Sequence, residues 1–197
     1  MKIMISVAHD GADDKGAVNK EFGLNEYEFS QKVSSACSTE LNRLFDADVS
    51  YVYDIGQVYP HRDTKILKLK KDSPDLAIEI HLNASTDKAI NYGSVFHWGT
   101  NQLTKNIASK IADKFDALSA KGITPHKFNK SVSLPAEGYD IKRFWFITKT
   151  CCLTMIIEPM FISNDSACLF LNKKNSHKIV GGAVASGIYE VLKNGIA

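Results

Sequence analysis

The sequence has few cysteines, and none of them stands in a Cys-x-x-Cys spacing. The four occupy positions 37, 151, 152 and 168 of the 197 residues. Cys37 and Cys168 fall within apolar patterns of helical spacing, where a cysteine acts as a small core residue. The cysteines therefore indicate neither a disulfide framework nor a sulfur-based zinc site.

Long hydrophobic runs are also missing. No apolar stretch approaches the roughly 20 residues that a membrane-spanning helix needs, so we expect no membrane insertion. The first seven residues are too short for the apolar region of a secretion signal and run directly into polar residues. We therefore expect synthesis in the cytoplasm without a signal peptide.

Charge of one sign is not in excess. Lys and Arg total 24, and Asp and Glu total 22, which gives a formal net charge of +2. This near balance gives no case for a nucleic-acid partner, although a mildly positive chain can still approach an anionic polymer.

The sequence does contain an ordinary globular composition, arranged as alternating strands and helices. Apolar residues make up 44% and charged residues 23%, as in typical globular domains. Predicted strands span residues 3–7, 49–55, 76–80, 92–98, 143–148 and 153–158. Predicted helices span residues 26–45, 65–71, 103–118 and 176–192, with a short helix after residue 165. The pattern predicts one α/β domain over residues 1–197, with a six-stranded, largely parallel sheet and helices on both faces.

The predicted strand 153–158 ends in a carboxylate. Glu158 follows an apolar, β-branched run, and Pro159 cannot continue the hydrogen-bond ladder. Open α/β sheets bind ligands just outside their strand ends. Partial desolvation there raises the pKa of a carboxylate towards the range useful for a general base. The alternative is a strand-end glutamate that reaches water and has no chemical role.

Two histidines occupy the same kind of position. His9 follows the strand 3–7 and begins a glycine-containing polar loop, and His81 follows the strand 76–80. Glu79 precedes His81 by two residues, so strand alternation places both on one side of the sheet. Glu79 could orient the imidazole of His81, or it could be an edge acid. Taken alone, the position of His9 favours an exposed surface histidine.

A second glutamate lies in the first turn of the predicted helix 26–45. Asn25 and Glu28 form an N-cap with its capping-box partner. Glu26 lies three residues before Phe29 and therefore projects with the apolar stripe of the helix. Because an unpaired buried charge is costly, an inward-facing Glu26 needs a partner, which a metal ion would provide. The alternative is a solvated Glu26 on the rim.

Two segments are less informative. Residues 122–140 show no clear period, and loops of this length are often functional. His126 in this segment is a candidate for substrate contact, although the favoured interpretation is a surface histidine. The basic segment 65–71 predicts a helix with a solvated face.

His9, Glu26, His81 and Glu158 thus stand at element ends that a parallel sheet can bring to one edge. Two neutral imidazoles and one carboxylate form a common catalytic zinc set, in which water takes the open position. A fourth group held nearby, here Glu158, can deprotonate that water. The sequence therefore predicts a hydrolytic site with one zinc ion.

Four motifs carry a resemblance that covers nearly the whole chain in order. They are Val7-Ala8-His9-Asp10-Gly11 with Gly16-Ala17, Glu26-Tyr27-Glu28-Phe29-Ser30, Glu79-Ile80-His81-Leu82-Asn83-Ala84, and Glu158-Pro159-Met160-Phe161-Ile162-Ser163-Asn164. With these motifs the chain resembles the zinc-dependent N-acetylmuramoyl-L-alanine amidases of the Amidase_3 type. The resemblance implies a mixed six-stranded sheet flanked by helices, in agreement with the six predicted strands.

The resemblance also implies roles for particular residues. His9, Glu26 and His81 are the implied zinc ligands, and Glu158 is the implied catalytic base. The implied substrate is peptidoglycan, cleaved at the amide between the lactyl group of N-acetylmuramic acid and the L-alanine of the stem peptide. Weaker candidates, for substrate contact or for orienting a ligand, are Asn83, His126 and Glu79.

The biological setting is a separate expectation. The Glu-Pro-x-Phe form of the last motif resembles phage lysins. With the missing secretion signal and no separate cell-wall-binding domain, it favours a phage endolysin that a holin releases to the cell wall in the periplasm. Alternatives are a bacterial housekeeping amidase, a zinc carboxypeptidase acting on stem peptides, or an inactive wall-binding module. A cysteine hydrolase using Cys151 or Cys152 is disfavoured because no histidine lies nearby in sequence.

Overall fold

The computed structural model describes residues 1–54, 62–126 and 128–193. Its strands are β1 (Ile3–Val7), β2 (Val18–Asn19), β3 (Leu24–Asn25), β4 (Ser50–Tyr53), β5 (Leu76–Ile80), β6 (Gly93–Trp98), β7 (Phe128–Leu134) and β8 (Leu153–Glu158). Its helices are α1 (Glu26–Phe45), α2 (Arg62–Asp72), α3 (Gln102–Ala120), η2 (Ile141–Arg143), α4 (Trp145–Thr148), α5 (Asp165–Leu171) and α6 (Ser176–Leu192). The predicted strand 49–55 is β4, and its last predicted residue, Ile55, lies outside the described residues.

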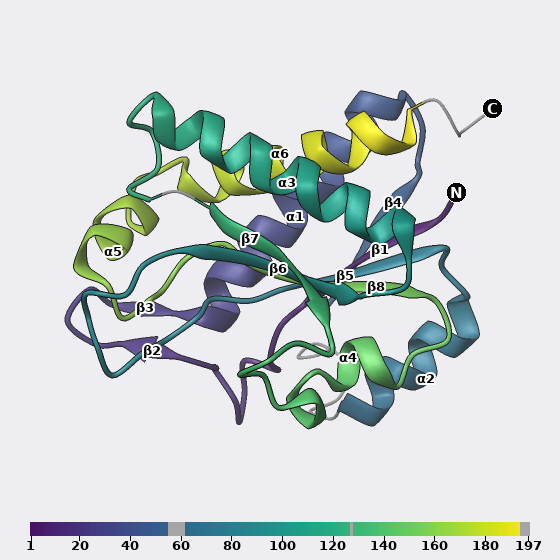
Figure 1. Cartoon of the computed structure of the whole chain (residues 1–197), viewed down its shortest axis with the longest axis horizontal. Helices are drawn as coiled ribbons and strands as arrows, with labels where there is room; N and C mark the ends of the chain where they lie inside the picture. Colours follow the sequence, from purple (N-terminus) through teal and green to yellow (C-terminus); the bar gives the residue numbers. More distant parts are fainter. Residues whose placement is uncertain (55–61, 127, 194–197) are drawn as a thin grey trace.

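Six strands form a central sheet in the order β4-β1-β5-β8-β6-β7 (Figure 1). Strands β4, β1, β5 and β8 run parallel, β6 is antiparallel to β8, and β7 is parallel to β6. The carboxyl ends of β1, β5 and β8 therefore meet at one edge of the sheet. The predicted mixed, mostly parallel sheet is confirmed.

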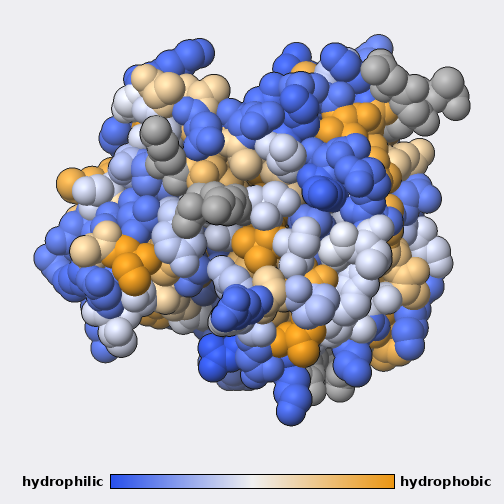
Figure 2. All heavy atoms as spheres, in the orientation of Figure 1, coloured by the Kyte–Doolittle hydropathy of each residue, from blue (hydrophilic) through white to orange (hydrophobic). Residues whose placement is uncertain are grey.

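Helices cover both faces of the sheet. Figure 1 shows α1, α3 and α6 on one face and α2 and α4 on the other. Because the strands are covered on both sides, alternate residues enter two cores: Ile3 and Ile5 join the first, and Met4 the second. This explains the uninterrupted apolar runs in the sequence. On the face shown in Figure 2, hydrophobic residues form small patches between hydrophilic ones, as on ordinary globular domains.

Helix α1 begins where the sequence predicts. The side chain of Asn25 accepts a hydrogen bond from the backbone N of Glu28 at 2.9 Å, which caps the first turn. Further along, α6 packs closely on α1 at Gly181, where an added Cβ would lie 2.8 Å from the backbone N of Cys37. The cap and this packing fix α1, and with it Glu26 in its first turn. No helix within the described ranges is long and apolar enough to cross a membrane.

One predicted strand is wrong. Residues 143–148 form the end of η2 and the helix α4. Their aromatic and β-branched side chains favour a strand. However, the neighbours Phe146 and Ile147 are both buried in the same core. A helical turn permits this arrangement, whereas a strand would point successive side chains to opposite faces.

The remaining strand of the central sheet is β7, which lies inside the segment that the sequence presents as an irregular loop. It pairs with β6 at the edge of the sheet. The register shifts between Gly93 and Ser94, and such an irregularity breaks strand alternation. As a result, Phe128 enters one core and Leu134 the other. An edge strand with broken alternation leaves little periodic signal.

Candidate metal centre and active site

His9 lies in a tight loop directly after β1. Its backbone φ is +62°, and Asp10 stabilises the loop by accepting hydrogen bonds from three of its backbone amides at 2.9–3.0 Å. Oδ2 of Asp14 contacts Nδ1 of His9 at 2.8 Å. With Nδ1 engaged in this way, Nε2 of His9 faces Glu26.

Gly16 closes the same loop. Its φ is +66°, and an added Cβ would lie 2.4 Å from Cδ2 of His9 and 2.5 Å from Oε2 of Glu26. A side chain here would therefore occupy the space beside the two functional groups. Because glycine has no side chain, the space beside His9 and Glu26 stays open.

Glu26 stands between the two histidines and is only 4% exposed. Its Oε2 lies 3.1 Å from Nε2 of His9, and its Oε1 lies 2.9 Å from Nδ1 of His81. The backbone amides of Ala17 and Leu82 donate to the same carboxylate, each at 2.9 Å. Glu26 therefore points inward, and the alternative of a solvated rim position is wrong.

Glu79 and His81 lie on the same side of the sheet, as strand alternation predicts. Nε2 of His81 is 3.1 Å from Oε2 of Glu79. The other carboxylate oxygen of Glu79 pairs with the ammonium group of Lys65. Lys65 is 2% exposed, so its predicted solvated position is wrong. It shares the inward face of α2 with the buried Leu69, one turn later.

The charges of this centre are coupled. Burial alone would raise the pKa of Glu26, but the hydrogen bonds and charges of His81 and His9 hold that pKa well below its usual range. Burial would lower the pKa of His81, whereas Glu26 and Glu79 raise it to about 10. The pKa of His9 is likewise raised against its burial, by Glu26 and Asp14. In the metal-free protein the imidazoles thus favour their cationic form beside a carboxylate.

The three side chains suit a divalent metal ion. One ligand atom from each of His9, Glu26 and His81 lies within 4.8 Å of the other two. Two imidazole nitrogens and one carboxylate oxygen form a donor set suited to catalytic zinc. Each histidine also has a carboxylate on its other nitrogen, Asp14 and Glu79 respectively, as metal-binding histidines usually do. The residues present therefore fit the predicted ion.

Glu158 ends β8 beside this centre. Its Oε2 accepts a hydrogen bond from Nδ2 of Asn83 at 2.5 Å. Burial raises the pKa of Glu158 to about 7, although the charge of His81 opposes the shift. A carboxyl group that titrates near neutral pH can both accept and return a proton. The predicted rise in pKa is confirmed.

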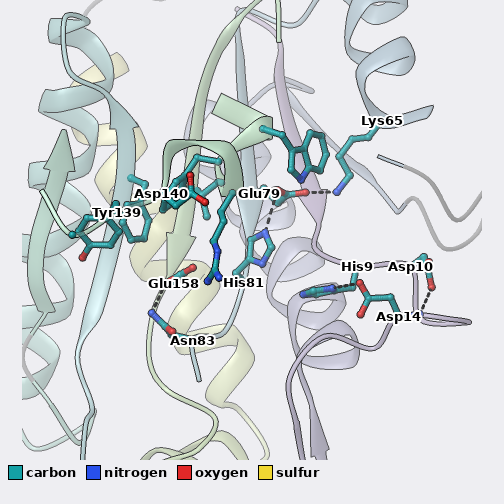
Figure 3. A pocket seen from close by; sticks show the side chains of 16 residues that line it. His9, Asp10, Asp14, Lys65, Glu79, His81, Asn83, Tyr139, Asp140 and Glu158 are labelled. Atoms are coloured by element: carbon teal, nitrogen blue, oxygen red, sulfur yellow. Dashed lines mark hydrogen bonds and ion pairs between the residues drawn. The ribbon is translucent and has the colours of Figure 1, made fainter. Parts of the chain in front are cut away.

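His9, His81 and Glu158 line one cavity of about 790 Å³ (Figure 3). Figure 3 shows Glu79 between Lys65 and His81, and Glu158 beside Asn83. A second wall comes from residues 138–145, which contribute aromatic side chains and a guanidinium group: Tyr139, Phe144, Trp145 and Arg143. The sequence does not reveal this wall, because residues 143–148 resemble a strand. The signal that could have found it is the high density of aromatic residues there.

His126 does not line this cavity. It is 9% exposed, and its Nε2 lies 2.8 Å from the carbonyl oxygen of Pro159. The favoured surface position is therefore wrong. The contact instead holds the backbone directly after Glu158.

The two neighbouring cysteines also lie outside the cavity lining. Cys151 is exposed and Cys152 is half-buried. Burial raises the pKa of the Cys152 thiol to about 11, which disfavours the nucleophilic thiolate. This geometry gives no support to a cysteine hydrolase.

Comparison with known proteins identifies the family of this chain. The family model of Amidase_3, N-acetylmuramoyl-L-alanine amidase, matches residues 3–190. The chain belongs to this family. As a member of this amidase family it is a hydrolase that acts on the peptidoglycan of the cell wall.

Solved structures of amidases have the same fold. The amidase AmiC2 of Nostoc punctiforme is 15% identical, with a TM-score of 0.78 over 98% of this chain and 97% of that one. The catalytic domain of CwlV from Bacillus (Paenibacillus) polymyxa var. colistinus is 18% identical, with a TM-score of 0.77 over 98% and 99%. The catalytic domain of the CD27L endolysin, which targets Clostridia difficile, is 20% identical, with a TM-score of 0.70 over 96% and 97%. A search of the curated proteins found no match.

Proposed function

We propose that this amidase is zinc-dependent and hydrolyses the amide between the lactyl group of N-acetylmuramic acid and the L-alanine of the stem peptide. The observation that carries the proposal is the position of Glu158. This carboxylate is held by the amide of Asn83 and has a pKa of about 7. It lines the same cavity as His9 and His81, beside the three-residue donor set.

His9, Glu26 and His81 would hold the zinc ion. When bound, zinc polarises the scissile carbonyl and lowers the pKa of a water molecule. Asp14 and Glu79 engage one nitrogen of each imidazole, and so leave the other nitrogen to face the ligand site. Glu26 is fixed by backbone amides on both sides, which limits the movement of the donor set.

Glu158 carries the proton transfers. Its carboxylate accepts a proton from the attacking water while the oxygen of that water adds to the carbonyl carbon. Glu158 then returns the proton to the nitrogen of L-alanine as the C–N bond breaks. The products are the lactyl carboxylate and a free amine. Asn83 holds one oxygen of Glu158 and leaves the other for the water; contact of Asn83 with substrate stays a prediction.

The wall formed by residues 138–145 faces the substrate. Its aromatic side chains offer flat surfaces on which a sugar ring can pack, and Phe96 supports them, with its ring centroid 5.2 Å from that of Tyr139 and 4.7 Å from that of Phe144. Arg143 supplies a guanidinium group suited to a stem-peptide carboxylate. The cavity volume is in the range of small-molecule sites, so it can take the junction of sugar and peptide.

The proposal is tested by mass analysis of digested peptidoglycan, with and without a chelator. We expect new amino-terminal L-alanine, stem peptides of unchanged length, and loss of both signals in the chelator. Shortened stem peptides with released D-alanine would instead identify a carboxypeptidase. Undiminished cleavage in the chelator would overturn zinc dependence.

We further propose that the enzyme is a phage or prophage endolysin. The Glu158-Pro159-Met160-Phe161 sequence supports this setting. The test is inducible expression in a bacterial host with and without a holin. Lysis that depends on the holin is expected, whereas equal lysis without it would count against the endolysin role and favour a housekeeping amidase.

A further inference from the structure

Lys65 is a buried cation that lies outside the proposed set of metal ligands. Its ammonium group donates to the carbonyl oxygen of Val7 at 3.0 Å and pairs with Oε1 of Glu79. Both side chains of the ion pair are only 3% exposed. A buried charge of this kind persists only when its hydrogen-bonding groups are engaged. These contacts therefore fix the position of the Lys65 ammonium group.

The same ammonium group also faces two aromatic rings near α4. It lies 5.6 Å from the ring centroid of Trp145 and 5.9 Å from that of Phe146, within the range of cation–π contacts. The Nζ atom of Lys65 on α2 thus contacts Val7 of β1 and Glu79 of β5, and it faces two rings of α4. Trp145 also lines the cavity, so this junction supports both walls of the site.

Glu79 connects Lys65 to His81, which is a predicted metal ligand. One carboxylate oxygen contacts Lys65, and the other lies 3.1 Å from Nε2 of His81. Nδ1 of His81 then faces Glu26 at 2.9 Å. Each ring nitrogen of His81 therefore has its own neighbour: Nε2 faces Glu79, and Nδ1 faces the ligand site.

We propose that Lys65 is a positioning residue for the metal centre. It fixes Glu79 as the acceptor for the Nε2–H group of His81, and thereby presents Nδ1 of His81 to the ion. Through Val7 it also fixes the end of β1, two residues before His9. This inference rests on the zinc site of the proposed function and adds a residue outside the three-residue donor set.

The first test compares two lysine variants by competition with a chromophoric zinc chelator. Lys65→Met should weaken zinc binding by about 10–100-fold, the usual effect of losing a partner that orients a ligand. Lys68→Met is the matched control. Lys68 lies on the same helix, but it is 37% exposed and pairs with Asp72 at 2.7 Å, so zinc affinity should not change. A zinc Kd within twofold of wild type in folded Lys65→Met would overturn the proposal.

The second test asks whether Lys65 acts through Glu79. In the Glu79→Gln background, Lys65→Met should weaken zinc binding no further, because the charged link is already lost. Equal weakening in both backgrounds would overturn the proposal and leave Lys65 a structural residue. The double variant removes both charges of the buried pair together, a change that proteins often tolerate. It therefore remains informative if Lys65→Met alone does not fold.

A third measurement needs no variant. Long-range ¹H–¹⁵N NMR of the zinc-loaded wild type should show the His81 proton on Nε2 and none on Nδ1. The reverse assignment would overturn the proposal. If the wild type binds no zinc, the proposed function fails; if it binds zinc and Lys65→Met binds equally well, only the inference about Lys65 fails.

Discussion

Glu26 and Glu158 have the same type of side chain, but their surroundings shift the pKa in opposite directions. Glu26 accepts hydrogen bonds from backbone amides and faces two imidazoles, and its pKa falls. Glu158 meets one side-chain amide, and burial raises its pKa to about 7. Because the hydrogen bonds and charges of the two histidines outweigh desolvation at Glu26, whereas desolvation outweighs the charge of His81 at Glu158, one carboxylate suits a metal ligand and the other a proton carrier.

The first prediction concerns the proposed role of Glu158 as a proton carrier. Glu158→Gln keeps the shape of the side chain but cannot accept a proton from water. We expect kcat to fall by about 10²–10⁴-fold, the usual contribution of a general base, while bound zinc stays at one ion per chain by metal analysis. Glu40→Gln is the control, since Glu40 pairs with Arg43 on the surface of α1 and is not among the residues that line the cavity. A kcat for Glu158→Gln within tenfold of wild type would contradict the role.

The second prediction concerns protons at the proposed ligand residues. The pKa of His81 is about 10 and that of His9 is raised, so in the metal-free protein at least His81 is protonated at pH 7. Zinc requires the neutral imidazole, so binding should release protons. Because these pKa values are raised, apparent affinity should increase between about pH 6.5 and 10, roughly tenfold per unit for each proton released.

Calorimetry in two buffers of different ionisation enthalpy measures that release directly. At pH 7.5 we expect at least one proton per zinc ion. A heat of binding that is the same in both buffers would contradict the prediction, because it would mean that the histidines are neutral before the ion arrives.

Single residues at element ends were the most predictable part of the site. His9 and His81 follow buried strands, Glu158 ends one, and Glu26 opens a capped helix, so topology alone brings them to one edge. Lys65 was not predictable, because its basic neighbours are typical of a solvated face. Its burial depends on Glu79, which is distant in sequence and becomes its partner only once α2 packs on the sheet.

At the scale of elements, two adjacent glycines on α6 should respond in opposite ways. At Gly181 an added Cβ would lie 2.8 Å from the backbone N of Cys37 and 2.9 Å from the backbone O of Val33 on α1. Gly181→Ala should therefore lower the free energy of unfolding by about 1–3 kcal/mol through overpacking. Gly182 has no atom within 4 Å of an added Cβ, so Gly182→Ala should raise it by up to about 1 kcal/mol through helix propensity.

Urea unfolding of both variants, followed by circular dichroism, measures this difference. Stabilisation by Gly181→Ala would contradict the close approach of α1 and α6. The pair is informative because the two changes are chemically identical and differ only in which face of the helix they occupy.

Elements with a regular period were predictable, and those without one were not. The helix 176–192 has its predicted bounds because Val180, Val184 and Ile188 repeat at helical spacing and are buried. Strand β7 was missed because its register shift breaks alternation, and α4 was mistaken for a strand because four residues give no period. The number of strands in the central sheet was nevertheless correct, since one missed strand offset one false strand, whereas the short strands β2 and β3 form a separate sheet that was not predicted.

At the scale of the whole molecule, the fourth prediction is that zinc stabilises the fold. Zinc at 100-fold above its Kd should add about 2.7 kcal/mol, which raises Tm by roughly 5–11 °C for a chain of this size. Differential scanning fluorimetry with zinc and with a chelator measures the shift. His81→Ala should abolish it, and His177→Ala, a change on α6 outside the donor set, should retain it. An equal shift in His81→Ala would place the ion elsewhere.

The strand that closes the sheet is the last one in the sequence. β8 lies between β5 and β6 and pairs with both. A nascent chain that has left the ribosome only as far as residue 152 therefore carries His9, Glu26 and His81, but it lacks Glu158 and the strand that joins the two halves of the sheet. The proposed metal ligands are thus translated before the proposed proton carrier. Translation order thus delays hydrolytic competence until the sheet can close.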